Sequence, residues 1–261
     1  MVPGHHRDAR GLAGDPAERP IDGRAGVPRQ ESSVHGGFGG GVPHSRPGPE
    51  IDGPCGPVVL LEQFNVGPLQ NFTYLVAESE GGEGAVIDPS YDVAPVLQAI
   101  DDRSVKVRYI LNTHSHQDHT AGNAEVRAHT GAKVVAHKVA PLGQDVSVED
   151  GSVFDAGRLK FSVAHTPGHT KDSVLYLFEG QVATGDTLFV GECGRTDLPG
   201  GDPSEMYDSL LGRVVKLDDG LVVLPGHDYG ATPTSTIGRE KRENYTLKPR
   251  TRAEFLRFLR E

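Results

Sequence analysis

Cysteine is scarce in this chain, because only Cys55 and Cys193 occur among its 261 residues. Two cysteines cannot build the disulfide network that small secreted proteins use for stability. The first 30 residues also contain no apolar stretch of the length that signal peptides have. We therefore expect the protein to be cytoplasmic.

Long apolar runs and an excess of positive charge are missing as well. The apolar cluster Val58-Val59-Leu60-Leu61 is far shorter than the roughly 18 residues that a membrane helix needs. The formal net charge is −10, which makes nucleic acid and anionic membranes unsuitable partners for the surface as a whole. The composition therefore predicts a protein that binds no nucleic acid and no membrane.

Glycine and proline are concentrated in the first part of the chain. Residues 1–57 contain 13 of the 34 glycines and 9 of the 19 prolines, and they show no apolar periodicity. Such a composition cannot bury enough apolar surface to offset the entropy that is lost on folding. We predict a disordered N-terminal extension over residues 1–57 and one catalytic domain over residues 58–261.

The pattern of that domain predicts alternating strands and helices. Short β-rich runs between turn residues indicate strands, and apolar residues at helical spacing, with Asp92 as one cap, indicate helices. The expected strands are 58–66, 71–77, 84–88, 107–112, 133–136, 152–154, 159–164, 174–178, 181–184 and 221–224, and the expected helices are 92–102, 121–131, 204–216, 236–244 and 253–260. The simplest packing is an α/β fold of two mixed sheets with helices outside them.

Three imidazoles and a carboxylate follow the strand predicted over 107–112. The segment reads Thr113-His114-Ser115-His116-Gln117-Asp118-His119. In an extended segment His114 and His116 point to the same side and can share one cation, whereas Asp118 and His119 face a second position beyond the bend. A solvated turn before a helix is the alternative. Four ligand-type residues in six positions favour a metal site.

Three more ligand candidates, His169, Asp186 and His227, occur where other predicted strands end. Each of them alone would more often be a turn or capping residue. Together the candidates complete a set with one group for each of two metals and a carboxylate between them. The first group is His114, His116 and His169, the second is Asp118, His119 and His227, and Asp186 lies between the two. Asp118 and Asp186 are also the predicted catalytic carboxylates.

The chain resembles the metallo-β-lactamase superfamily in four blocks: Thr113-His114-x-His116-x-Asp118-His119, Thr166-Pro167-Gly168-His169-Thr170, Gly185-Asp186-Thr187 and Gly226-His227. The resemblance spans residues 58–250 and implies an αββα sandwich with the metals at one edge of the two sheets. Further blocks are similar to the glyoxalase II and persulfide dioxygenase branch, whose substrates are low-molecular-weight thiol derivatives. These blocks are Cys193-Gly194-Arg195-Thr196-Asp197, His227-Asp228-Tyr229, Ser235-Thr236-Ile237 and Glu240-Lys241-Arg242.

This branch implies two activities. A glyoxalase II-like hydrolase cleaves a thioester of glutathione or a similar thiol by a metal-bound hydroxide, and it uses two divalent cations, for which zinc, iron or manganese would serve. A persulfide dioxygenase oxidises a glutathione-type persulfide with one non-haem Fe(II), held here by His114, His169 and Asp186.

The departures from the family pattern point in different directions. Only 34 residues follow His227, fewer than the helical C-terminal domain of the longer glyoxalase II proteins, and this favours the dioxygenase. In contrast, the compact hydrolases that lack this C-terminal domain have a similar segment to one found here, Leu198-Pro199-Gly200-Gly201. We place the hydrolase first and keep the dioxygenase as the alternative.

The expected partner is a small thiol-derived substrate. Arg195 is predicted to bind it by the planar guanidinium and Tyr229 to reach the same cleft, while a structural ion pair and simple packing are the alternatives for these two residues. Cys193 is expected to be a small buried residue. Arg239, Lys241 and Arg242 are expected to form a solvated helix face that attracts an anionic substrate. A nucleic-acid-processing enzyme is disfavoured, and a homodimer is left open.

Deletion of residues 1–57 should leave the melting temperature and the activity nearly unchanged, because their composition predicts no docking on the domain. Thermal unfolding and activity assays of the full-length and shortened proteins test this expectation. A large loss of either property would show that the segment packs on the domain or completes its active site.

Overall fold

The structure is a computed structural model that describes residues 59–259. The extension predicted over residues 1–57 therefore lies outside the described residues. Within the described part, no helix is long and apolar enough to cross a membrane.

Two six-stranded sheets face each other. The first consists, in order across the sheet, of β1 (Leu60–Val66), β2 (Asn71–Ala77), β3 (Glu83–Ile87), β4 (Lys106–Leu111), β5 (Lys133–His137) and β6 (Val146–Val148). The second consists of β12 (Ser235–Thr236), β11 (Val222–Pro225), β10 (Gln181–Gly185), β9 (Val174–Phe178), β8 (Leu159–His165) and β7 (Val153–Ala156). Both sheets are mixed, since β3 to β6 are parallel in the first and β10 and β11 are parallel in the second.

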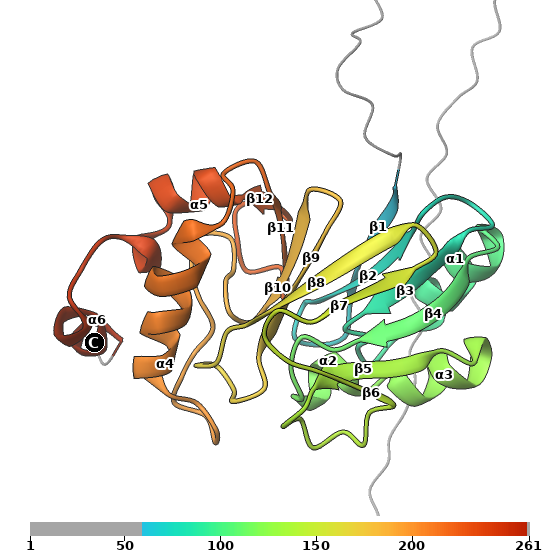
Figure 1. The fold of residues 1–261 in the computed structure, drawn as a ribbon, viewed down its shortest axis with the longest axis horizontal. Helices are drawn as coiled ribbons and strands as arrows, with labels where there is room; N and C mark the ends of the chain where they lie inside the picture. The colour runs from blue at the N-terminus through green and yellow to red at the C-terminus, as the bar shows by residue number, and fades with distance from the viewer. Residues whose placement is uncertain (1–58, 260–261) are drawn as a thin grey trace, which may run out of the picture. The chain divides into compact units, whose positions relative to one another are not determined.

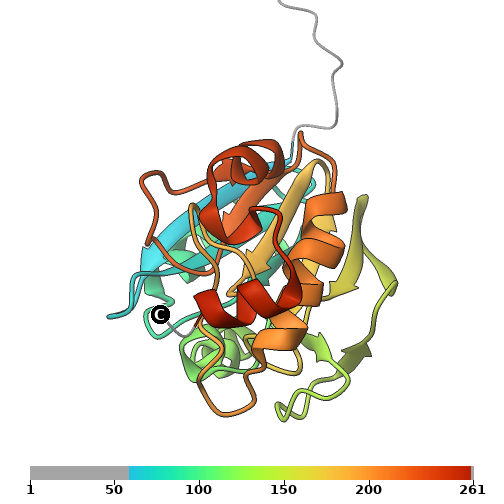
Figure 2. The ribbon, with the colours of Figure 1, turned by 90° about the vertical axis from the view of Figure 1, so that its left-hand side faces the viewer.

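Helices cover the outer face of each sheet (Figure 1). The helices α1 (Ala94–Asp102) and α3 (Asn123–Thr130) pack on the first sheet, whereas α4 (Pro203–Tyr207), α5 (Ile237–Glu243) and α6 (Arg252–Phe258) lie outside the second. Figure 2 shows α4, α5 and α6, coloured orange to red, in front of the second sheet. This arrangement confirms the predicted αββα sandwich.

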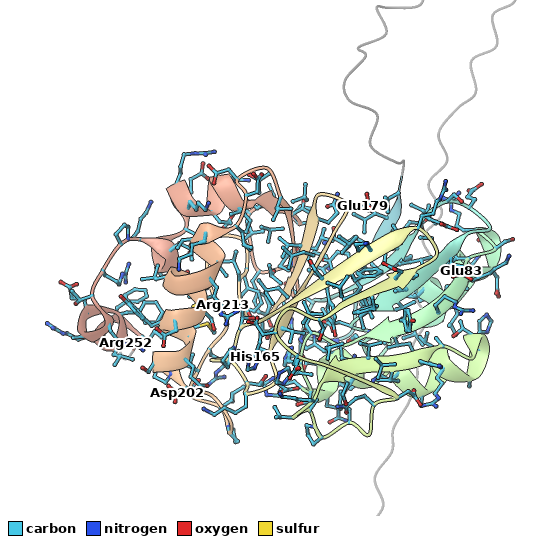
Figure 3. All side chains as sticks on the ribbon, viewed as in Figure 1. Glu83, His165, Glu179, Asp202, Arg213 and Arg252 are labelled. Atoms are coloured by element: carbon cyan, nitrogen blue, oxygen red, sulfur yellow. The ribbon has the colours of Figure 1, made fainter. Side chains whose placement is uncertain are left out.

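The main apolar core lies between the sheets, where side chains fill the space (Figure 3). In β8 the buried residues Leu159, Phe161 and Val163 alternate with more exposed ones, as expected for a strand with one face toward the core. All seven residues of β2 are buried, because one face meets the second sheet and the other meets α1.

The predicted elements are present, with differences in detail. The helix predicted over 121–131 is α3, and the short helix α2 (Gln117–Thr120), which was not predicted, precedes it. The two helices are separate because the chain turns at Gly122, whose N–H donates to the Pro89 carbonyl. The helix predicted over 204–216 continues from α4 as a π-helical turn (Asp208–Arg213) and a 3-10 turn (Val214–Lys216).

The other differences concern short strands and a helix cap. The strands β6 and β12 were not expected, since three and two residues are too few to show a period-two pattern. The cap residue of α1 is Val93, not Asp92, although the Asp92 carboxylate accepts a hydrogen bond from the Ala94 amide at 3.3 Å.

Backbone hydrogen bonds join the two sheets at one edge. The Val174 N–H donates to the Thr113 carbonyl, and the Phe72 N–H donates to the Gly226 carbonyl, both at 2.8 Å. Asn71 forms an isolated β-bridge with His227. Since Thr113 and Gly226 each precede a ligand candidate, these bonds fix the edge at which the predicted site is expected.

Tyr74→Phe should lower the free energy of unfolding by about 1–3 kcal/mol. The Tyr74 hydroxyl is buried and donates to the Pro225 carbonyl at 2.7 Å, so its loss leaves a buried acceptor without this partner. Urea denaturation measures the change. The matched control is Tyr109→Phe, on a partly buried ring that packs against Phe154 at 5.3 Å between centroids. Equal losses in the two variants would contradict the assigned role of the Tyr74 hydroxyl.

Candidate metal centre

Three histidines converge at the edge where the sheets are joined. His114 and His116 follow β4, and His169 lies in the turn after β8. The Nδ1 atom of His116 is 3.1 Å from His114 Nε2 and 2.9 Å from His169 Nε2. Two ligands of one cation, each bound at about 2.1 Å, are separated by distances of about this size. These residues therefore form one candidate metal position.

A second group lies beside the first. Asp118 and His119 belong to the short helix α2, and His227 follows β11. The Nε2 atoms of His119 and His227 are 3.2 Å apart, and Asp118 Oδ2 is 3.4 Å from both. The three side chains form a second candidate position.

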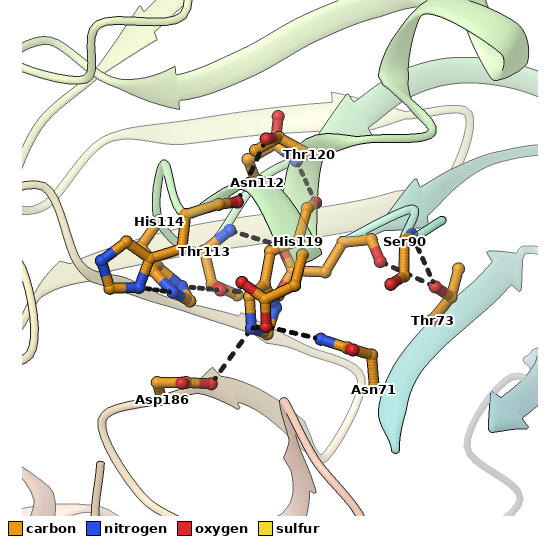
Figure 4. A network of polar contacts seen from close by, with 12 residues as sticks. Asn71, Thr73, Ser90, Asn112, Thr113, His114, His119, Thr120 and Asp186 are labelled. Atoms are coloured by element: carbon orange, nitrogen blue, oxygen red, sulfur yellow. Dashed lines mark hydrogen bonds and ion pairs between the residues drawn. The ribbon is translucent and has the colours of Figure 1, made fainter. Parts of the chain in front are cut away.

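Asp186 lies between the two groups. Its Oδ1 is 3.3 Å from His119 Nε2 (Figure 4). Its Oδ2 is 3.3 Å from His169 Nε2 and 3.5 Å from His227 Nε2. The backbone of Gly226 lies close to Asp186. A Cβ at position 226 would be 2.4 Å from Asp186 Oδ1, so only glycine fits there. The structure thus brings all seven candidates together in the predicted grouping, and their role as metal ligands stays a prediction.

Hydrogen bonds on the outer side of three rings orient the inner nitrogens. The Nδ1 of His169 faces the Arg195 carbonyl at 2.7 Å, and that of His227 faces the Leu69 carbonyl at 2.9 Å. The Nδ1 of His119 lies 3.2 Å from Asp88 Oδ2. Because a carbonyl or carboxylate only accepts, each Nδ1 carries a proton, so Nε2 is the atom of each ring that faces inward and can bind a cation.

Asp88 and Asn71 are parts of this site that the sequence analysis missed. The Thr113 N–H and hydroxyl donate to the two oxygens of Asp88 at 2.7 and 2.6 Å, so this buried carboxylate fixes both His119 and the start of the ligand segment. The Asn71 amide donates to Asp118 Oδ2 at 2.9 Å (Figure 4). Asp88 is the last residue of the strand predicted over 84–88 and directly follows the observed β3, which was a usable signal, whereas nothing in the sequence distinguishes Asn71.

The arrangement fits divalent cations. The Nε2 atoms of His119 and His227 face each other at 3.2 Å, so a proton or a metal cation has to lie between them. Among the described residues, the buried Oδ1 of Asp186 finds no hydrogen-bond partner. Imidazole and carboxylate donors without thiolate suit zinc, iron and manganese.

Carboxylates set the charge of the second group. Burial lowers the pKa of His119, but Asp186, Asp118 and Asp88 outweigh this effect and hold that pKa well above its usual value. Burial also opposes the shift of His227, whose pKa Asp118 and Asp186 raise to about 9. The group therefore attracts positive charge, and a metal cation would displace protons from it.

The first group has the opposite character. Burial, together with the charge of the neighbouring His119, holds the pKa of His114 well below its usual value. Burial and His169 likewise lower the pKa of His116. Both rings are therefore neutral at pH 7 and able to bind a cation without losing a proton.

A cleft of about 1010 Å³ opens from the candidate centre to the surface. Its walls are the loop after β10 and the C-terminal segment, and both predicted substrate-binding residues line it. Arg195 forms a two-bond pair with Asp197, both bonds being 2.7 Å, on an exposed part of the wall. Tyr229 stacks on the His227 ring at 4.6 Å between centroids. Their contact with substrate stays a prediction.

Cys193 and His165 lie near the candidate centre and have structural contacts. Cys193 is buried in the cleft wall, where burial and Glu192 raise the pKa of the thiol to about 12, so it is not a thiolate. His165, labelled in Figure 3, stacks on His137 at 4.0 Å between centroids. Neither residue belongs to the two ligand groups.

Comparison with known proteins agrees with this geometry. The family model described as Metallo-beta-lactamase superfamily matches residues 66–142 and 139–227. A hydroxyacylglutathione hydrolase of Anaeromyxobacter dehalogenans (strain 2CP-C) is 43% identical over 163 residues, which are 62% of this chain and 62% of that protein. The match therefore spans less than two thirds of the length of that relative.

Relatives of the other activity align over more of their length. The mitochondrial persulfide dioxygenase ETHE1 of Homo sapiens is 32% identical over 202 residues, which are 76% of this chain and 78% of that protein. The crystal structure of ETHE1 from Myxococcus xanthus superposes with a TM-score of 0.73 at 33% identity and covers 77% of this chain and 90% of that chain.

His169→Ala and Asp186→Ala should each reduce the metal content and abolish activity while the fold is kept. Both side chains are candidate ligands under either chemistry, and apolar burial supplies most of the stability of the sheets. Elemental analysis and circular dichroism of the purified variants test this. His165→Ala, four positions before His169 and outside the ligand groups, is the control. Full metal content in either ligand variant would refute the assignment.

Proposed function

Because the chain belongs to the metallo-beta-lactamase superfamily and its relatives are of the glyoxalase II and ETHE1 branch, we propose that it is a metal-dependent thioester hydrolase. Its substrate would be a thioester of glutathione or a similar low-molecular-weight thiol, hydrolysed in the cytoplasm. The observation that carries the proposal is Asp186, whose two oxygens lie 3.3 Å from a histidine of each ligand group. A carboxylate in this position can bridge two cations.

Two divalent cations held by these groups would lower the pKa of a water toward neutrality and stabilise the charge that develops on the thioester carbonyl oxygen. The chain itself supplies acceptors that orient this water. Burial raises the pKa of Asp118 and of Asp186, but the neighbouring histidines outweigh burial and hold both values well below the usual range. Both carboxylates therefore stay ionised at neutral pH and can accept hydrogen bonds from the attacking water.

The leaving group of such a reaction needs little help from the protein. A thiol has a pKa of about 8.5, so its thiolate departs without a general acid. The protein must instead hold the thiol carrier in the cleft. Arg195 and Tyr229 are the proposed contacts, since both line the cleft and Tyr229 also stacks on a ligand candidate.

Persulfide oxidation is the second candidate function. The longer alignment with the human enzyme and the superposition on the Myxococcus xanthus structure favour it. His114, His169 and Asp186 would hold a single Fe(II) and leave positions for dioxygen and the persulfide. In that case Asp118 and His119 would only support the ligands from outside.

His119→Ala separates the two functions. In a two-metal hydrolase this variant should lower thioester hydrolysis by about three orders of magnitude, because the second cation loses a ligand. The wild-type protein, purified without added metal, should bind about two metal equivalents and consume no oxygen with glutathione persulfide. His129→Ala, on an exposed histidine paired with Asp101, is the control and should change nothing.

A different result would reject the hydrolase. One tightly bound iron per chain, with rapid oxygen uptake on addition of glutathione persulfide, would establish the dioxygenase instead. Metal analysis, oxygen consumption and thioester cleavage, measured in parallel on one preparation, distinguish these outcomes.

A further inference from the structure

The loop after β10 carries two parts of the candidate metal centre. Asp186 begins it, and the Arg195 carbonyl that accepts from His169 Nδ1 ends it. The Gly194 N–H donates to the Asp186 carbonyl at 3.0 Å and closes the loop. A Cβ at Gly194 would lie 2.0 Å from that carbonyl oxygen and 3.1 Å from His169 Nδ1. The positions of two ligand candidates therefore depend on the conformation of this loop.

A tight turn over residues 189–192 forms the middle of the loop. The Phe189 N–H donates to the Glu192 carbonyl at 2.9 Å, and Gly191 has a φ of +84°, which favours glycine. The ring of Phe189 meets the rings of His227 and Tyr229 edge-on, at 5.7 and 5.4 Å between centroids. The turn thus also touches a third ligand candidate.

Two polar side chains at the end of α5 hold this turn. Glu240 Oε2 accepts from the Gly191 N–H at 2.8 Å and from the Asn244 amide at 2.9 Å. The Asn244 amide also donates to the Glu192 carbonyl at 3.0 Å and lies 3.4 Å from the Phe189 carbonyl. Because the two residues are four positions apart, they occupy one face of the chain at the helix end.

The burial of Glu240 is unusual for a carboxylate. Its exposed fraction is 1%, and its hydrogen-bond donors are all neutral: the Gly191 N–H, the Asn244 amide and the Ser235 hydroxyl at 2.5 Å. Burying a carboxyl group is unfavourable unless hydrogen bonds satisfy it, and an apolar side chain could fill the same volume. The two acceptor oxygens, however, hold the turn and β12 at the same time.

We propose that Glu240, together with Asn244, is a positioning residue for the candidate metal centre. It fixes the turn over 189–192, and through this turn it sets Asp186 and the carbonyl that orients His169. This inference rests on the metal site of the proposed function but on neither of the two reactions. It assigns a role in metal binding to a residue that contacts no ligand candidate.

The test compares Glu240→Ala with Glu240→Gln and with Glu243→Ala. Glutamine can still accept from Gly191 and can donate to the Ser235 hydroxyl, so it should restore what alanine removes. Glu243 is on the same helix but is exposed and paired with Arg239, so its loss should have no effect. Asn244→Ala removes the side-chain amide that donates to the turn carbonyls and to Glu240, and so disrupts the same turn from a second residue.

Two readouts are independent of any substrate. Competition with a chromophoric chelator should show Zn²⁺ binding weakened by about 10–100-fold in Glu240→Ala and Asn244→Ala, and close to wild type in Glu240→Gln. In hydrogen exchange of the metal-free proteins, Glu240→Ala and Asn244→Ala should exchange faster than the wild type over residues 186–195, while β8 and β9 exchange at the wild-type rate. If no thioester is hydrolysed, both measurements still decide this inference.

Unchanged Zn²⁺ affinity in a folded Glu240→Ala protein would overturn the inference. So would an equal loss in Glu243→Ala, or failure of Glu240→Gln to restore affinity. If Glu240→Ala and Asn244→Ala both unfold the metal-free protein as a whole, the role is structural, and the inference is equally rejected.

Discussion

The contact between two histidines from distant parts of the chain is the constraint on which the rest of the structure depends. His119 and His227 are 108 positions apart in the chain, and their outer nitrogens are bonded so that the two Nε2 atoms face each other at 3.2 Å, a contact that needs a proton or a metal cation between them. Bringing them together requires the two sheets to be fixed at their common edge. The backbone bonds from Val174 to Thr113 and from Phe72 to Gly226 do this, with the apolar core between the sheets as their support.

The division between core and edge explains why the site can be so polar. The core residues Leu111, at the end of β4, and Leu224, next to the end of β11, lie shortly before ligand segments, so apolar burial determines where those segments begin. Beyond the strand ends, specific donors and acceptors hold buried polar groups such as Asp88, which accepts two hydrogen bonds from Thr113. The sheets supply the stability, and the polar contacts at their edge set the positions of the ligand candidates.

The sequence was sufficient to predict the sandwich and to find the seven candidates, because each candidate follows a strand with a clear apolar pattern. Strand β2 was predicted with its observed bounds, while the break between α2 and α3 depends on a tertiary bond from Gly122 to Pro89. The carbonyls that orient His169 and His227 could not be predicted, since backbone atoms carry no residue-type signal.

The burial of Glu240 also could not be predicted from the sequence. Glu240 stands between basic residues that predict a solvated helix face, and only the packing of α5 against the loop after β10 makes it a buried acceptor.

The two ligand groups are separate from the wall of the cleft, and this separation bears on both proposed reactions. The proposed reactions would use the same candidates in different ways, with two cations for thioester cleavage and one Fe(II) for persulfide oxidation. Under either proposal the substrate contacts would lie in the outer cleft, which Arg195, Tyr229, Tyr245 and Phe258 line. Glu240 and Asn244 hold the loop after β10, which lies between the candidate metal centre and the outer cleft, through contacts from α5. The outer wall can therefore change its substrate contacts while Asp186 and His169 keep their positions.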